Sequence, residues 1–583
     1  MIKLFRFLKP YWFLVVLTLG LVFLQSMADL YLPTLMSSII NDGVMKGNTD
    51  KILEIGAWML AVTGGGMLVS IVSSLLSSRV ALGMGRDIRS RLFRKVTSFS
   101  LEEYDHFGAA TLITRNTNDI VQVVNVTVMI LRMMVAAPLM MAGGILMAYS
   151  EDAGLTWVLG VAVPVLLVLI LALAGKALPL FQAMQKRIDR INLVLREKLT
   201  GIRVIRAFGR EQREAERFGQ ANEELTDTYI KVNVIMAFMM PGIMLIMSCT
   251  QLAILWFGII RIDAGDMQIG SLMAFTQYAV QILMSLMMVS MVFIMVPRAS
   301  SAAKRLNEVL AVDPTINDPG ANADAVAPAV LGESAAKGTV EFRNVSFRYH
   351  GAEQNALENL SFVAQPGQVT AIIGSTGAGK TSLLNLIPRF YDVAEGQVLV
   401  GGVDVKAQTQ ADLRGKLGYI PQKALLFTGT IEDNLRQGKA DASETELATA
   451  LRVAQAQEFV TEMEGGLQHT LAQGGTNVSG GQKQRLSIAR ALVRRPEVYL
   501  FDDSFSALDY RTDRDLRTAL KAETKDATVL LVAQRVGTIR DADQILVLDE
   551  GKLVGQGTHN QLLDNCPTYQ EIVASQLSQE EAR

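Results

Sequence analysis

The chain has little cysteine and little net charge, and no cleaved leader is expected. Its two cysteines, Cys249 and Cys566, lie far apart in the expected topology, so neither a disulfide framework nor a metal site is expected. A net charge of −2 argues against nucleic acid as a partner. The first apolar run continues well past the apolar core of a signal peptide, and we therefore expect it to be a retained membrane span.

Apolar residues, by contrast, are abundant. They make up 50% of the 583 residues and the mean hydropathy is positive, yet 19% of the residues are charged. A single soluble domain does not have this composition, whereas a membrane half joined to a soluble half does. The composition therefore predicts two parts of different character.

Six stretches are apolar enough to cross a bilayer, which takes about 20 residues in a helix. These stretches are residues 11–41, 55–78, 121–150, 153–175, 232–260 and 267–297. We therefore expect a transmembrane domain of six helices over residues 1–311.

Lysine and arginine are distributed unevenly between the connections of these stretches. Residues 79–115 hold seven of them and residues 176–231 hold twelve, whereas the opposite connections are short and poor in base. Because positive charge stays on the cytoplasmic side, we expect a multi-pass protein of the cell membrane with both termini and both long loops in the cytoplasm. The basic, amphipathic residues 2–12 are expected to lie along the inner interface.

Residues 374–381 read GSTGAGKT, which is the G-x-x-x-x-G-K-[ST] pattern of a phosphate-binding loop. An apolar strand precedes the motif and a helical pattern follows it, as the motif requires. Its glycines let backbone N–H groups turn toward phosphates, and the helix adds its positive end. The predicted ATP-binding residues are Gly374, Ser375, Thr376, Gly377, Ala378, Gly379, Lys380, Thr381 and Ser382.

The same pattern predicts how Mg²⁺ is held beside ATP. Lys380 can neutralise charge on the β- and γ-phosphates, and Thr381 offers a hydroxyl ligand. The apolar residues 498–501 read as a buried strand that ends in Asp502, whose carboxylate would be a second ligand. ATP and Mg²⁺ are therefore the expected ligands of the soluble half.

Residues 478–482 read VSGGQ and are followed by KQRLSIARAL, which resembles the signature motif of ABC transporters. The resemblance extends over the whole chain. It implies a membrane α-helical domain of six transmembrane helices fused to an α/β P-loop ABC nucleotide-binding domain, here residues 339–583. Residues 312–338, rich in Ala, Pro, Gly and Asp without a period, are expected to be the linker.

The resemblance also implies roles for single residues. Tyr349 matches the aromatic residue that stacks on adenine, and Gln422 matches the glutamine that senses Mg²⁺ and the coupling to the membrane domain. Residues 506–509 match the D-loop. Nucleotide domains of such transporters pair head to tail, so that the signature of one chain completes the ATP site of its partner. The residues implied in that role are Ser479, Gly480, Gly481 and Gln482.

Two positions depart from the hydrolytic machinery of the family. Asp503 stands where a general-base Glu is usual, and Gln534 stands where a His contacts the γ-phosphate. Asp withdraws the carboxylate by roughly 1.5 Å, and a base misplaced by about 1 Å can cost on the order of 10²-fold in rate. Gln forms hydrogen bonds but carries no positive charge. The pattern resembles the degenerate-site subunit of heterodimeric bacterial ABC exporters, whose homologous partner chain carries Glu and His.

This resemblance implies an ATP-driven exporter of amphipathic compounds, drugs or lipids, whose own ATP site hydrolyses weakly. A slow homodimeric exporter or flippase with Asp and Gln in both sites is one alternative. A membrane protein that is gated by ATP and transports little is another. Gln473, where exporters commonly have Glu, affects contacts with the membrane domain and not the class.

In exporters of this family, paired membrane helices continue into the cytoplasm and end in short coupling helices on the nucleotide domains. Residues 100–108 resemble the first coupling helix, and residues 201–218 cover the region of the second. An ordinary solvated helix face remains the simpler explanation for any single residue in these loops.

Two features of the membrane half concern the substrate. Methionines crowd the fifth and sixth stretches, where flexible thioethers suit a cavity for varied apolar molecules, although packing or lipid contact explains each one as well. Asp29 is an ionisable residue inside the first stretch, where charge is costly. We interpret it as part of an outer gate or of a site for cationic substrates, with an interfacial position near the helix end as the alternative.

Overall fold

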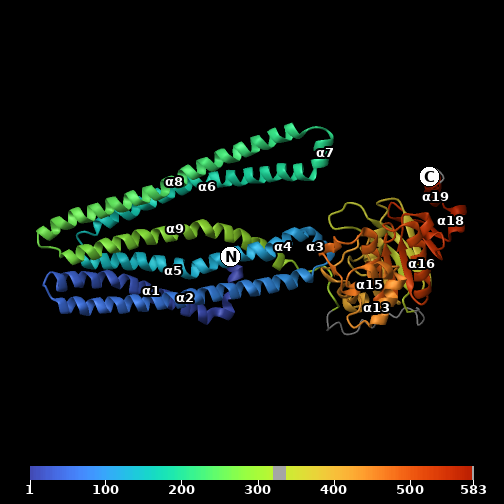
Figure 1. Cartoon of the computed structure of the whole chain (residues 1–583), viewed down its shortest axis with the longest axis horizontal. Coiled ribbons are helices and arrows are strands. Elements are labelled where there is room, and N and C mark those ends of the chain that lie inside the picture. Colours follow the sequence, from blue (N-terminus) through green and yellow to red (C-terminus); the bar gives the residue numbers. More distant parts are fainter. Residues whose placement is uncertain (320–336, 581–583) are drawn as a thin grey trace. The chain divides into compact units, whose positions relative to one another are not determined.

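The structure, a computed structural model, describes residues 1–319 and 337–580 (Figure 1). The chain divides into two compact units. The first comprises Met1–Thr97 and Ala109–Val312, and the second comprises Ser98–Gly108 and Asp313–Arg583. Most of the expected linker, residues 320–336, lies outside the described residues.

The first unit consists of helices. Among the described residues, six helices are long and apolar enough to cross a membrane, as the sequence predicts. With η marking 3-10 and π helices, the elements are η1 (Ile2–Tyr11), α1 (Trp12–Ser38), η2 (Ile39–Val44), α2 (Thr49–Thr97), α4 (Ala109–Thr114), η3 (Arg115–Asp119), α5 (Ile120–Glu151), α6 (Trp157–Thr200), α7 (Ile202–Ala207), α8 (Glu211–Asp263) and α9 (Ile269–Ala311).

The long helices extend beyond the apolar stretches inside them. α2, α6, α8 and α9 all continue into polar sequence, whereas α6 begins slightly later than expected because residues 153–156 form a turn. Ion pairs join the polar parts of α6 and α8: Arg190 pairs with Glu224, and Arg217 pairs with Glu197, each at 2.8 Å. Apart from short breaks at residues 98–100, 108, 201 and 208–210, the chain stays helical through the loops that are rich in lysine and arginine.

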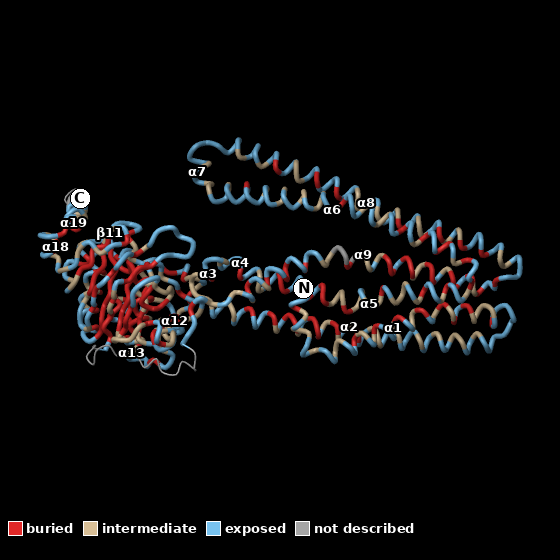
Figure 2. The backbone as a smooth tube through the Cα atoms, turned by 180° about the vertical axis from the view of Figure 1, so that it is seen from behind, coloured by how far each residue is buried: buried red, intermediate tan, exposed pale blue. Residues whose placement is uncertain are grey.

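Within the first unit, α1, α2, α5 and α9 pack together and α6 pairs with α8 (Figure 1). Small residues allow close approach, because a Cβ at Gly85 of α2 would lie 2.5 Å from Val124 of α5. Such packing replaces the hydrophobic effect, which does not draw helices together in lipid. Much of the apolar surface of these helices points outward (Figure 2), as expected where lipid is the solvent.

The amphipathic opening forms η1 and packs against α2. Leu4 is fully buried, and the Tyr11 hydroxyl donates a hydrogen bond to Asp87 Oδ2 at 2.8 Å. Gly83 of α2 permits the contact, because a Cβ there would lie 2.7 Å from the Tyr11 ring. Lys3 and Arg6 remain exposed. The segment thus presents bases outward and an apolar anchor inward.

The second unit is an α/β domain. Six strands form a sheet in the order β12-β11-β3-β10-β9-β6, four form a sheet in the order β2-β1-β4-β5, and β7 pairs with β8. The elements are α3 (Leu101–Phe107), β1 (Val340–Phe347), β2 (Leu357–Ala364), β3 (Val369–Gly374), α10 (Lys380–Leu386), β4 (Glu395–Val400), β5 (Val403–Asp404), α11 (Gln410–Gly415), β6 (Leu417–Ile420), β7 (Gly429–Thr430), α12 (Ile431–Arg436), α13 (Glu444–Val453), α14 (Gln457–Glu462), η4 (Gly466–Gln468), β8 (Thr470–Leu471), η5 (Gln473–Gly475), α15 (Gly480–Arg494), β9 (Val498–Asp502), α16 (Tyr510–Glu523), β10 (Thr528–Val532), α17 (Val536–Ile539), β11 (Gln544–Asp549), β12 (Lys552–Gly557), α18 (His559–Asn565) and α19 (Pro567–Glu580).

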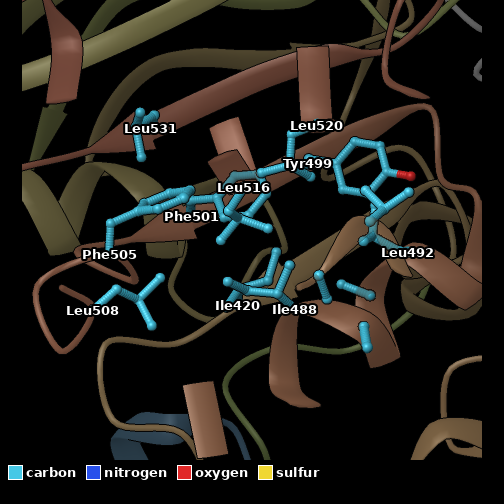
Figure 3. Packing of buried hydrophobic residues seen from close by; sticks show 14 of the residues in the cluster. Ile420, Ile488, Leu492, Tyr499, Phe501, Phe505, Leu508, Leu516, Leu520 and Leu531 are labelled. Atoms are coloured by element: carbon cyan, nitrogen blue, oxygen red, sulfur yellow. The ribbon is translucent and has the colours of Figure 1, made fainter. Parts of the chain in front are cut away.

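The six-stranded sheet is buried on both faces. Along β9, Tyr499 and Phe501 belong to one apolar cluster, whereas Leu500 belongs to another. Figure 3 shows the first cluster, in which Phe501 lies near Leu516 of α16 and Ile488 of α15. Successive side chains of a strand point to opposite faces, so a continuous apolar run is typical of a central parallel strand. The predicted fold class, six apolar helices followed by an α/β P-loop domain, is confirmed.

The close contact of α2 with α5 gives a testable consequence. The variant Gly85→Val should destabilise the protein by about 1–3 kcal/mol, because the added methyls must displace the Val124 side chain from a packed interface. Thermal unfolding of the purified protein in detergent measures the change. Gly64→Val is the matched control, since a Cβ at Gly64 would meet nothing within 4 Å. Equal loss of stability in both variants would contradict this packing.

Candidate active site

Four neighbouring parallel strands end at the same edge of the sheet. β3 lies beside β10, β10 beside β9, and β9 beside β6. The segments that follow these strands carry the phosphate loop, Asp503, Gln534 and Gln422. Residues that are distant in sequence therefore gather at the carboxyl ends of the strands, where open α/β sheets bind ligands.

The phosphate loop joins β3 to α10. Gly379 has a φ of +93°, and a Cβ there would lie 2.8 Å from the carbonyl oxygen of Ala356, so the loop requires glycine at this position. The Lys380 ammonium donates to the carbonyl oxygens of Gly374 at 2.8 Å and Ser375 at 2.7 Å. Burial lowers the pKa of Lys380, and the nearby carboxylates oppose that effect.

Thr381 and Asp502 meet at the base of the loop. The Thr381 hydroxyl donates to Asp502 Oδ1 at 2.9 Å. Asp502 is buried; this burial raises the pKa of its carboxyl, and the Thr381 hydrogen bond acts in the opposite direction. A hydroxyl and a carboxylate are oxygen ligands of the kind that Mg²⁺ takes together with phosphate oxygens. In the part of the chain that the structure describes, no group of three or more His, Cys, Asp or Glu could hold a metal by itself.

Asp503 lies between two side-chain amides. Gln534 Nε2 donates to Asp503 Oδ2 at 2.7 Å, and Gln422 Nε2 donates to the same oxygen at 3.2 Å. We call this arrangement the amide clamp. Burial raises the pKa of the Asp503 carboxyl, whereas the Gln422 hydrogen bond, the charge of Lys380 and the Gln534 hydrogen bond lower it. The two positions that depart from the family pattern are therefore in direct contact.

The backbone of Asp503 also has an unusual conformation. Its φ is +46°, in the left-handed region that few residues other than glycine adopt and that short polar residues tolerate best. Its N–H donates to the carbonyl oxygen of Val532 at 3.0 Å. This contact with β10 fixes the start of the segment that carries the clamped carboxylate.

Tyr349 lies beside the phosphate loop with its ring partly exposed. Its hydroxyl is 2.8 Å from the Ser382 hydroxyl. Phe347 and Tyr391 contact the ring edge-on, at centroid distances of 4.7 and 5.3 Å. These contacts hold a flat apolar surface next to the loop, as stacking on a nucleotide base requires.

The signature residues form the start of α15. The Ser479 N–H donates to Gln482 Oε1 at 2.9 Å, and the Gln482 N–H donates to Ser479 Oγ at 3.3 Å, which makes a capping box. Among the described residues, no hydrogen bond joins Ser479–Gln482 to the phosphate loop of the same chain. Ser479 and Gly480 remain exposed at the surface of the domain.

The first expected coupling helix is α3, and it belongs to the second unit. The Ser100 N–H donates to Glu103 Oε2 at 2.7 Å, and the Thr315 N–H donates to Glu103 Oε1 at 2.9 Å. Burial disfavours the Glu103 carboxylate, but the hydrogen bonds from Ser100 and Thr315 outweigh it and lower the pKa of Glu103. We call this contact the Glu103 latch, because it fastens α3 to the segment that leads into the nucleotide domain.

Further contacts explain why α3, although it lies within residues 1–311, groups with the nucleotide domain. The Tyr391 hydroxyl donates to Asp105 Oδ2 at 3.4 Å, and His350 Nδ1 lies 3.4 Å from Glu102 Oε1. Burial, with the nearby Asp105 charge, raises the pKa of Tyr391 to about 12. The compact unit thus includes residues 98–108, which the sequence placed with the membrane domain.

Two other predicted features lie in the membrane unit. α7 occupies the region of the second expected coupling helix, and the Val204 and Phe208 side chains there are exposed. Asp29 lies on α1, half-buried. The ATP-binding residues and Asp29 thus belong to different units of the chain.

A phosphate loop with a Thr–Asp pair suited to Mg²⁺, carried by a chain with six membrane helices, defines an ATP-dependent membrane protein. Family comparisons agree. The model described as the ABC transporter transmembrane region matches residues 15–286, and the model described as ABC transporter matches residues 357–506. The chain belongs to the ABC transporters.

Similar proteins narrow this assignment. An uncharacterized ABC transporter ATP-binding protein of Mycobacterium tuberculosis is 45% identical over 98% of this chain and 97% of its own length. An ATP-dependent lipid A-core flippase of Xanthomonas oryzae pv. oryzae is 30% identical, over 100% of this chain and 97% of its own length. The solved structure of a bacterial Atm1-family ABC exporter with ATP bound matches with a TM-score of 0.78 at 26% identity, covering 97% of this chain and 98% of that one. The chain is therefore an ABC exporter half-transporter that couples ATP hydrolysis to transport.

Sequence reasoning placed the residues of the phosphate site but missed two contacts. The amide clamp depends on strand register, which joins residues 31 and 81 positions apart. The Glu103 latch had a partial signal, since Ser100 and Glu103 have the spacing of a capping box. Nothing in the local sequence indicates that Thr315 is the second donor.

The Glu103 latch predicts a local change in dynamics. In Glu103→Gln, amide hydrogen exchange of residues 313–318 should become faster by about five- to tenfold, because a neutral amide accepts a weaker hydrogen bond than a carboxylate. Hydrogen–deuterium exchange of the full chain measures this effect. Glu353→Gln, which makes the same change at an exposed position of the nucleotide domain, should leave the exchange unaltered. Equal exchange in wild type and Glu103→Gln would contradict the latch.

Proposed function

We propose that this chain is the degenerate-site subunit of a heterodimeric exporter: it binds ATP at its own phosphate loop and hydrolyses it slowly. The amide clamp is the observation that supports the proposal best. A general base must direct a free lone pair at the attacking water. In this chain, both amides donate to Oδ2 of Asp503, which leaves the carboxylate fewer free lone pairs for a water.

The short side chain of Asp503 weakens it further as a general base. The Asp503 side chain is one methylene shorter than Glu, which withdraws its carboxylate by roughly 1.5 Å, and small displacements of a base cost orders of magnitude in rate. Gln534 keeps a hydrogen-bonding group beside the site but supplies no positive charge and no transferable proton. The two substitutions support each other, because the Gln534 amide is a donor that suits a short carboxylate.

ATP binding itself has all the groups it needs. Tyr349 would stack on adenine, the phosphate loop and Lys380 would surround the phosphates, and Thr381 with Asp502 would hold Mg²⁺. Gln422 would face the metal in that state, and Gln534 would remain as the donor to Asp503. The ion would neutralise phosphate charge, while the residues of this chain bind and orient the nucleotide. A site with strong binding and weak cleavage keeps ATP in place between transport cycles.

The exposed signature residues would complete the ATP site of a homologous partner that carries Glu and His. Their exposure supports this role, since Ser479 and Gly480 are free to face another chain. Hydrolysis on the partner's phosphate loop would then drive transport. α3 and α7 would pass the resulting motion to the membrane helices, with the nucleotide domain and both termini in the cytoplasm, as the distribution of Lys and Arg supports.

Amphipathic compounds, drugs or lipids are the proposed cargo, moved from the cytoplasm or the inner leaflet. The similarity to a protein named as a lipid A-core flippase supports a lipid-like substrate. An apolar cavity of about 700 Å³ between α1, α2 and α5, lined by residues such as Gly65, Gly143 and Met147, also suits an acyl chain. A homodimer with two weak sites would lack an efficient ATPase, and an ATP-gated protein would not need an exporter fold.

The amide clamp predicts how activity can be restored. In a heterodimer whose partner site is inactivated, Asp503→Glu should raise ATPase activity only modestly, because Gln534 remains in place. The double variant Asp503→Glu, Gln534→His should raise it by a further tenfold or more, on the order of what a placed acid–base pair contributes. Steady-state phosphate release measures both rates.

Asp526→Glu is the matched control, because it makes the same change at an exposed position of the nucleotide domain. It should leave the rate unchanged. A double variant that stays at the level of Asp503→Glu would overturn the proposed cause of the weak activity.

A further inference from the structure

Asp29 is an acid without a partner. It lies on α1 among apolar residues, about 13 Å before the end of that helix at Ser38 by the rise of an α-helix. Among the described residues, no hydrogen bond or ion pair reaches its carboxylate. An ionisable group at membrane depth is costly unless it faces a cavity or meets a partner. The position of Asp29 therefore requires an explanation beyond packing.

Gln281 provides a second unused acceptor, on α9, which packs against α1. Its Nε2 donates to the backbone carbonyl oxygen of Asp29 at 3.1 Å, which fixes the orientation of the amide. The other end of the same amide, Oε1, is buried and has no hydrogen-bond partner among the described residues. A flipped amide would place two oxygens together, so the unpaired acceptor remains. Each buried acceptor without a donor costs free energy.

The exposed face of α9 is rich in methionine on both sides of this point. Positions separated by three or four residues share a helix face. The residues on this face are Met273, Gln277, Gln281, Met284 and Met288. Met273, Met284 and Met288 are exposed, at 47%, 43% and 42%. Flexible thioethers adapt to apolar groups of varied shape.

We propose that Asp29 and Gln281 together bind the ammonium group of amphipathic primary or secondary amines, while the methionine face of α9 receives the apolar part. This substrate class rests on the proposed export function. The carboxylate supplies the opposite charge, and Gln281 Oε1 supplies an acceptor that only an N–H donor satisfies. An ammonium with N–H groups therefore supplies both a counterion for Asp29 and a hydrogen-bond donor for Gln281 Oε1.

Other classes of ligand supply only the positive charge or only the hydrogen-bond donor. A quaternary ammonium carries the charge but has no N–H to donate to Gln281. A neutral alcohol donates a hydrogen bond but leaves the Asp29 charge without a counterion. A hard metal ion takes six or more oxygen ligands, and the described residues here offer no group of acids to supply them.

Equilibrium binding to the transporter in lipid nanodiscs tests the proposal. The full chain, purified with its partner and without nucleotide, is titrated with radiolabelled dodecylamine, which is charged at neutral pH. Saturable binding is taken above that of empty nanodiscs. Asp29→Asn should weaken the affinity by about tenfold or more, the loss expected when a charge-assisted hydrogen bond is removed.

Gln281→Leu should weaken dodecylamine binding by about fivefold and leave dodecyltrimethylammonium binding unchanged, because only the first ligand donates to Oε1. Gln251→Leu, the same change on α8 and outside the proposed site, is the control for both ligands. It should leave both affinities unaltered.

Unchanged dodecylamine affinity in Asp29→Asn would overturn the proposal. Equal loss of both ligands in Gln281→Leu would overturn the role of the N–H donor. Because no nucleotide is present, these results do not depend on the rate of hydrolysis at Asp503. If the proposed slow hydrolysis proved wrong, the binding results would still stand. If the binding proposal proved wrong, the proposed slow hydrolysis would be unaffected.

Discussion

Two side-chain amides, from Gln422 and Gln534, donate hydrogen bonds to one oxygen of Asp503. The carboxylate follows β9, and the amides follow β6 and β10, so the sheet itself brings them together. Around this point the phosphate loop and the Thr381–Asp502 pair keep every group that ATP and Mg²⁺ need. Under the proposed function, binding and cleavage would be separated within one site, and the proposed catalytic partner follows from that separation.

The contacts that hold α3, the first expected coupling helix, are of a different kind. Glu103 accepts hydrogen bonds from Ser100 and Thr315, so α3 is held at both its own start and the segment entering the nucleotide domain. Tyr391 adds a contact to Asp105 close to Tyr349. These contacts would connect α3 to the proposed adenine site through neighbouring aromatic side chains. In the membrane unit, Asp29 of α1 and Gln281 of α9 are polar residues within apolar helices. The Gln281 amide donates a hydrogen bond to the backbone carbonyl oxygen of Asp29.

The sequence predicted well wherever a signal is local. Apolar runs predicted six membrane helices, and GSTGAGKT predicted the loop between β3 and α10, where Thr381 meets Asp502. It predicted poorly wherever a contact depends on register between distant segments. Asp503 and Gln534 were recognised as departures, but their hydrogen bond follows from the pairing of β9 with β10. Asp29 was singled out as an acid in an apolar helix, yet its neighbour Gln281 lies 252 residues away and gave no local indication. The polar extensions of α2, α6 and α8 were expected only from the family resemblance, because hydropathy marks the membrane and not the end of a helix.

The retention of intact ATP on this chain tests the account most directly. The transporter is purified from native membranes with whatever chain accompanies it, and is then photolabelled during turnover with 8-azido-ATP that carries the label on the γ-phosphate. The account predicts an equal amount of a second half-transporter and γ-label that stays on this chain, because the clamped Asp503 cleaves slowly. Loss of γ-label from this chain as fast as from its partner, or a transporter made of this chain alone, would contradict it.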